Sequence, residues 1–230
     1  MSAADQTLAV LCALLAVELV LLRHGQRRLF GVSMAATRSR LFAYVLAAPG
    51  TALHEAAHYL ACRALAVPTV GRTRLFWPQR TPEGHVVLGS VSHARTDALR
   101  QALISIAPLL LVPPMLVLAT ALLLSPHALS ALPNALGDVP WWRAALWGYL
   151  ALSCAQAVFP SPGDRLGAAE LGCLVGLAAG GTLLVLAVGH LPALLQVLGV
   201  AVGILALPAA AAGASLFALG LLRSATAPRL

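Results

Sequence analysis

The stretch that decides the fold is residues 41–66, which read LFAYVLAAPGTALHEAAHYLACRALA. An α-helix needs about 20 mostly apolar residues to cross a bilayer, and this stretch is long enough. At its centre stands the segment His54-Glu55-Ala56-Ala57-His58. An acidic side chain at the middle of a membrane helix costs about 2.5 to 3.5 kcal/mol on insertion scales unless it meets a partner. We therefore expect a membrane helix built around a polar site.

The composition of the whole chain is that of a membrane protein. The chain has 230 residues, of which 60% are hydrophobic and 10% charged, and its mean hydropathy is +0.86. Because so few side chains are charged, they cannot cover the surface of a soluble domain of this size. We therefore expect the apolar surface to face lipid. The formal net charge of +7 comes entirely from arginine, much of it between apolar runs. This pattern favours anionic lipid head groups over nucleic acid as the partner.

Six apolar segments of membrane-spanning length follow one another along the chain. They lie near residues 7–22, 41–66, 100–125, 143–160, 167–188 and 191–222. We therefore expect an all-α membrane protein, a polytopic bundle of about six transmembrane helices that forms a single integral membrane domain over residues 1–230. The part from 171 to 230 is expected to form a C-terminal helical hairpin.

A polar stretch from Pro68 to about Arg95 separates the second and third segments. It contains two strand-like runs, TVGRTRLFW and HVVLGSV, joined by PQRTPEG, which predicts a β-hairpin at about 68–93, with a plain loop as the alternative. Arginines flank or fill it, which places it on the cytoplasmic side. The arginine-rich linker 23–40 conflicts with this orientation if 41–66 crosses the membrane fully, and the sequence leaves that open.

The two histidines of the central segment are spaced to share a metal. Residues four apart lie on one face of a helix, so His54 and His58 can bind the same ion. A hydrolytic zinc site uses three protein ligands and keeps a fourth position for water, and Glu55 could accept a proton from that water. Pro49 and Gly50 break the preceding run, so Thr51 is a plausible N-cap. A chance match on a polar helix face is the alternative.

A third ligand must come from elsewhere, and the acids in or beside membrane segments are Glu18, Asp97, Asp164 and Glu170. Asp164 is the best placed, because it follows a stretch with two prolines and a glycine that would break a helix beside a buried site. Two alternatives remain: Asp164 could pair with Arg165 in an ordinary loop, or Glu170 could be the ligand. Four histidines in polar connections are expected at the surface: His85, His93, His127 and His190.

These residues together resemble the site-2 proteases, the intramembrane zinc metalloproteases of the M50 class. Members have an HExxH helix in the membrane, a β-hairpin after it and an NxxPxxPxD-like pattern whose Asp is the third zinc ligand. The separation from Gln156 to Asp164 equals that from Asn to Asp, and Pro162 falls on the second proline. Gln156 replaces Asn, the first proline is shifted by one place to Pro160, and Arg165 stands where Gly is usual. The resemblance covers residues 41–170, which would form the metalloprotease core.

The resemblance implies a zinc metalloendopeptidase that cleaves membrane-embedded protein substrates. Zn²⁺ would be held by His54, His58 and Asp164, with Glu55 as the general base and Gln156 in substrate binding. It further implies a multi-pass protein of the cell membrane whose site faces the cytoplasm and whose hairpin pairs with the unwound substrate as an added strand. The alternative function is a catalytically silent metal-binding membrane scaffold or chaperone. The sequence does not fix the oligomeric state.

Overall fold

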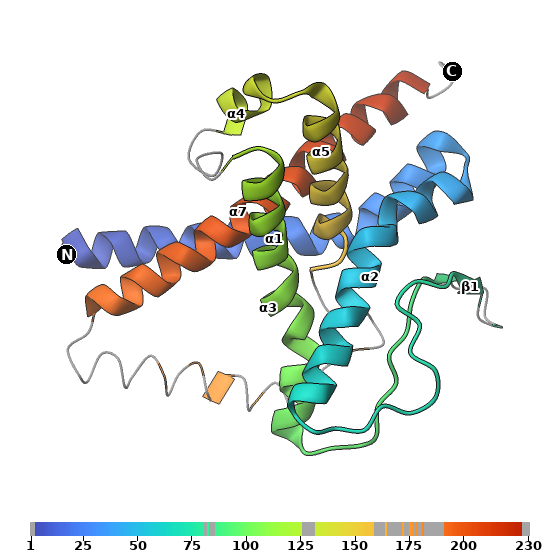
Figure 1. Cartoon of the computed structure of the whole chain (residues 1–230). Helices are drawn as coiled ribbons and strands as arrows, with labels where there is room; N and C mark the ends of the chain where they lie inside the picture. The colour runs from blue at the N-terminus through green and yellow to red at the C-terminus, as the bar shows by residue number, and fades with distance from the viewer. Residues whose placement is uncertain are drawn as a thin grey trace.

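The computed structural model of the chain is mostly helical, with one small two-stranded sheet (Figure 1). The structure describes residues 3–80, 82, 86–125, 132–158, 164, 172, 175–176, 178, 181 and 191–226. Its helices are α1 (Ala3–Thr37), α2 (Arg40–Ala64), α3 (Ala98–Leu123), α4 (Leu132–Asp138), α5 (Trp141–Ala155) and α7 (Leu191–Thr226). The expected fifth segment, near 167–188, lies almost wholly outside the described residues.

Helices α2, α3 and α5 pack against one another, and α1 and α7 lie alongside each other and run across this group (Figure 1). The main apolar core forms where the two sets meet. Leu22 of α1, Leu116 of α3, Ala155 of α5 and Ala209 of α7 are almost completely buried there. The small side chains of the alanines allow the helix backbones to approach closely.

Among the described residues, α3 is the helix that is long and apolar enough to cross a membrane, and α7 contains a shorter apolar stretch, Leu198–Ala214. Because α1 and α7 run across α3 in Figure 1, they do not form an upright bundle with it. The helical fold is therefore confirmed, whereas the expected bundle of six transmembrane helices is not.

Helix α2 begins well before the expected cap at Thr51, so that expectation is wrong. The helix starts after Ser39, whose Oγ accepts a hydrogen bond from the backbone N–H of Phe42 at 3.2 Å. It then continues through Pro49 to Ala64 without a break.

A side chain of α5 explains why Pro49 does not break α2. Proline has no N–H, so the carbonyl of Val45, four residues earlier, loses its helical donor. The hydroxyl of Tyr149 donates to that carbonyl at 2.6 Å. One turn further along both helices, the N–H of Gly50 donates to the hydroxyl of Ser153 at 2.7 Å. The two helices are thus joined by hydrogen bonds at successive turns.

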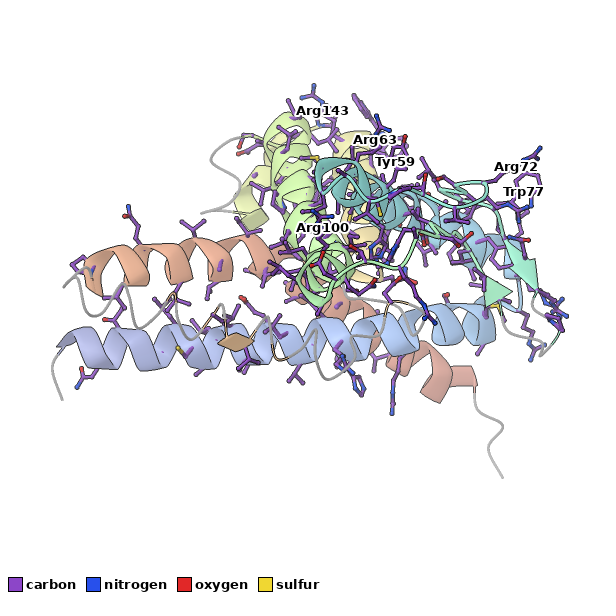
Figure 2. The ribbon with its side chains drawn as sticks, turned by 90° about the horizontal axis from the view of Figure 1, so that it is seen from below. Tyr59, Arg63, Arg72, Trp77, Arg100 and Arg143 are labelled. Carbon is purple, nitrogen blue, oxygen red and sulfur yellow. The ribbon has the colours of Figure 1, made fainter. Side chains whose placement is uncertain are left out.

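The expected β-hairpin is confirmed. Strand β1 (Gln79–Arg80) pairs with β2 (Val86–Val87) in an antiparallel sheet. The pairing continues toward the base of the hairpin through isolated bridges between Thr69 and His93 and between Arg74 and Ser90. Figure 2 shows Trp77 and Arg72 of the hairpin at the edge of the molecule, away from the labelled side chains of α2, α3 and α5.

The contact between α2 and α5 generates the first prediction. A Cβ atom at Gly50 would overlap the backbone carbonyl of Ser153, so Gly50→Ala must force the helices apart. We expect Gly50→Ala to lower the free energy of unfolding by about 1 to 3 kcal/mol, the usual cost of overpacking. Thermal unfolding of the detergent-solubilised protein measures this change.

Gly148 provides the matched control, because it lies in α5 and a Cβ there meets nothing within 4 Å. Alanine is favoured over glycine inside a helix by about 0.5 to 1 kcal/mol, so Gly148→Ala should raise the melting temperature. Stabilisation by both substitutions would contradict the close crossing at Gly50.

Candidate metal centre

Two side chains of α2 and a third from a distant part of the chain converge at one point. His54 and His58 lie one turn apart on this helix and are 5% and 3% exposed. Asp164, after α5, brings its Oδ2 to 3.4 Å from Nε2 of His54 and 3.3 Å from Nε2 of His58. The two Nε2 atoms are 3.1 Å apart. The structure therefore brings together the three ligands expected from the sequence.

The spacing of these three atoms fits a small tetrahedral ion. Zinc binds nitrogen and oxygen ligands at about 2.0 to 2.2 Å, so two ligands of a tetrahedral zinc lie about 3.3 Å apart. The three measured separations, 3.1, 3.3 and 3.4 Å, lie close to that value. Two imidazoles and one carboxylate are also the donor types that catalytic zinc takes in hydrolases.

Backbone carbonyls fix the orientation of both imidazoles. Nδ1 of His54 donates to the carbonyl of Ala157 at 2.6 Å, and Nδ1 of His58 donates to the carbonyl of Ile104 at 2.8 Å. A carbonyl oxygen can only accept, so each Nδ1 carries a proton and each Nε2 is left to offer its lone pair. Two lone pairs 3.1 Å apart repel each other unless a cation lies between them. Such second partners of ligand histidines orient the rings toward the metal.

Both acceptor carbonyls are available for a structural reason. Ile104 would ordinarily accept from the N–H four residues later in α3, but that residue is Pro108, which has none. Ala157 lies just beyond the end of α5, where carbonyls lack helical partners. Proline and helix termination thus supply the two acceptors that hold the histidines.

Glu55 lies beside the histidines and is held by the hairpin. Its side chain is half-buried, and its carboxylate accepts a hydrogen bond from the backbone N–H of Val91. Gly89 packs against it so closely that a Cβ there would come within 2.6 Å of the Glu55 Cγ. The position of the expected base therefore depends on the hairpin.

A cavity of about 280 Å³ opens beside the three ligands. It is lined by two of the ligands, by part of the hairpin and by one face of α3: His58, Asp164, Val91, Ser92, His93, Gln101, Ile104 and Ser105. His93 was expected at the surface, but it is half-buried in this wall, because the hairpin folds back on α2. Gln101 and Ser105 were not anticipated. Their signal in the sequence is their spacing, since polar residues four apart share one face of an otherwise apolar helix.

The other expected residues lie elsewhere. Gln156 is the C-cap of α5, where its amide donates to the carbonyl of Leu152 at 3.4 Å, and it does not line the described cavity. Its role in substrate binding stays a prediction. Glu18 lies in α1, outside the described cluster. Asp97 caps α3, and the N–H of Arg100 that donates to its carboxylate lowers its pKa.

The other residues considered around Asp164 lie outside the described part of the chain: Glu170, Arg165 and the stretch 159–163. No protein-family model matches the chain, and neither the curated proteins nor the solved structures contain one with significant similarity to it. Inference about function therefore depends on the geometry of the centre.

The role of Pro108 can be tested by replacing it. Pro108→Ala restores an N–H that competes with His58 for the carbonyl of Ile104, which weakens the orientation of the imidazole. We expect the affinity for zinc to fall by roughly tenfold or more, as for other changes in the partners of ligand histidines. Competition with a chromogenic chelator measures this affinity.

Pro114→Ala is the matched control, because it restores an N–H later in the same helix, away from the cavity. The zinc affinity of this variant should equal that of the wild type. An unchanged affinity in Pro108→Ala would show that the freed carbonyl does not orient His58.

Proposed function

We propose that the protein is an intramembrane zinc metalloendopeptidase that hydrolyses peptide bonds of membrane-embedded protein substrates. The observation that carries this proposal is the convergence of Nε2 of His54, Nε2 of His58 and Oδ2 of Asp164 at separations typical of zinc ligands. A carboxylate and a cavity beside the ligands add the two further parts that hydrolysis needs, a base and room for a substrate.

Each residue has a chemical task in this proposal. Zinc, when bound, lowers the pKa of a water molecule to about 7 and polarises a carbonyl group. Glu55 accepts the proton from the water and passes it to the leaving amine. Its carboxylate lies close enough to His54 and His58 to interact with their charges, and Val91 restrains its position. His54, His58 and Asp164 hold the metal.

The hairpin offers an edge on which an extended substrate could bind. Ser90 pairs with Arg74, and the carbonyl of Ser92 accepts from Val70, so these backbone groups face the first half of the hairpin. The N–H of Val91 points the other way, to Glu55. A transmembrane substrate must lose its helical hydrogen bonds before cleavage, and a strand edge can replace them.

Charge and aromatic residues support a membrane setting with the site on the cytoplasmic side. Arginines lie in the hairpin and at the helix ends that adjoin it: Figure 2 labels Arg72 in the hairpin, Arg63 near the end of α2 and Arg100 near the start of α3. At the beginning of α5, Trp141 and Trp142 are exposed. In Figure 1 this end lies opposite the hairpin along α3. Arginine is typical of the cytoplasmic face and exposed tryptophan of the interfaces, so the proposal places a multi-pass protein in the cell membrane.

Loss of the base tests the proposed reaction. Glu55→Gln keeps the three ligands and removes the proton acceptor, so we expect cleavage to fall by at least about 100-fold, the lower range for general-base removal. Wild type and variant are expressed in the same cells, and mass spectrometry quantifies new N-termini within transmembrane segments. Zinc content of the purified proteins should be equal.

Glu18→Gln serves as the control, because it removes a carboxylate of α1 that is not part of the cluster. It should leave the set of new N-termini unchanged. Identical N-termini in wild type and Glu55→Gln would contradict an endopeptidase. Full biological activity in Glu55→Gln would instead select the metal-binding scaffold or chaperone.

The ligand set has its own test. We expect His54→Ala and Asp164→Ala each to lose bound zinc, because each leaves two protein ligands where a hydrolytic site needs three. Metal analysis of the purified proteins by mass spectrometry measures the zinc content. Asp138→Asn, at the exposed end of α4, should retain full zinc content. Retention of zinc by Asp164→Ala would assign the third ligand to another residue.

A further inference from the structure

The hydroxyl of Ser105 is buried, and no task has yet been assigned to it. The side chain is 1% exposed, and its Oγ has no hydrogen-bond partner among the described residues. A serine inside a helix ordinarily donates to the carbonyl four residues earlier. Ser105 does not, and its residue lines the cavity beside the metal ligands. A buried hydroxyl without a partner costs free energy, so the site is suited to a group that arrives from outside the protein.

The other buried hydroxyl of α3 shows what a structural role looks like. Thr120 donates to the carbonyl of Leu116 at 2.8 Å and accepts from Nε1 of Trp147 at 2.8 Å. Its hydrogen bonds are made within the protein, and it does not line the cavity. Ser105 differs from it in both respects.

The position of Ser105 ties it to the metal centre. Its neighbour Ile104 holds the imidazole of His58 through the backbone carbonyl. Gln101, one turn earlier, lines the same cavity. Helix α3 thus presents two uncharged polar side chains next to a ligand histidine. Such groups suit a neutral polar partner, and the backbone of a peptide is one.

We propose that Ser105 donates a hydrogen bond to a backbone carbonyl of the bound peptide substrate, with Gln101 as the second polar group of the same subsite. This inference rests on the proposed endopeptidase function. An extended peptide in a site shielded from water needs a donor for each carbonyl. Because the N–H of Val91 already donates to Glu55, carbonyls of the peptide that face α3 need another donor, and Ser105 serves them.

Two metal-binding probes of different length test the subsite in the zinc-loaded, full-length protein in detergent. Acetohydroxamate binds a metal and offers no further peptide group, whereas N-acetyl-Leu-Leu-hydroxamate adds peptide carbonyls that extend into the cavity. Affinity is measured by calorimetry, so the test does not depend on activity. In Ser105→Ala we expect the affinity for the peptidyl probe to fall roughly threefold to tenfold, the effect of one neutral hydrogen bond, and that for acetohydroxamate to stay constant.

Stability distinguishes a binding role from a structural one. Ser105→Ala removes a hydroxyl that has no partner within the described part of the chain, so its melting temperature should equal or exceed that of the wild type. Thr120→Val, the matched control, should lower the melting temperature and leave the ratio of the two affinities unchanged.

Equal affinity of wild type and Ser105→Ala for the peptidyl probe would overturn the subsite and leave the metalloprotease proposal standing. Equal weakening of both probes would also overturn it, because the substitution would then act on the metal. Failure of the wild-type protein to bind either probe would contradict the proposed function, and the subsite with it.

Discussion

Each backbone carbonyl that a proline deprives of its helical donor needs another hydrogen-bond donor, and the packing around the candidate metal site depends on this need. In a protein interior, and above all in lipid, an unsatisfied carbonyl is costly, yet each proline inside a helix creates one. Pro49 leaves the carbonyl of Val45 without a donor, and Tyr149 supplies the bond. Pro108 leaves the carbonyl of Ile104 without one, and His58 supplies it. The first pair joins two helices, and the second orients one of the three candidate metal ligands.

Hydrogen bonds to backbone groups also explain the alignment of α2 with α5. Three hydrogen bonds connect them in register: Tyr149 to Val45, Gly50 to Ser153 and His54 to Ala157. Each step advances about one turn on both helices, so the chains run in the same direction. The glycine lets the backbones approach closely enough for the pattern to hold. The bond to His54 is the last of a series that begins at the far end of the contact, and the metal centre is thus fixed by the packing of the helices.

Local patterns in the sequence were sufficient for part of this architecture. The spacing of His54 and His58 predicts a shared face, and β-branched runs with turn residues predict the hairpin. The sequence also indicated Asp164, because few acids were available and prolines preceded it. Contacts between residues that are distant in the sequence could not be predicted from these local patterns. The continuity of α2 through Pro49 depends on Tyr149, whose hydroxyl binds the carbonyl of Val45, 104 residues earlier in the chain. The crossing of α1 and α7 over the other helices produces no periodic pattern in the sequence from which it could be predicted. Ser105 was missed because its spacing from Gln101 indicates a shared helix face but does not show that this face borders the candidate metal site.

In the proposed function, the hairpin both positions the base and forms one wall of the substrate site. Because its Gly89 has no Cβ, it leaves room for the side chain of Glu55, and its Val91 donates to the Glu55 carboxylate. Ser92 and His93, which follow Val91, line the cavity, so the residue that holds the expected base is adjacent in the chain to one wall of the cavity. A substrate that pairs with this edge would therefore bear directly on the segment that positions the base. In the proposed function, the hydrogen bond from Val91 to Glu55 would couple substrate binding at the hairpin to the position of the base, and Ser105 and Gln101 of α3 would contact the peptide from the opposite side of the cavity.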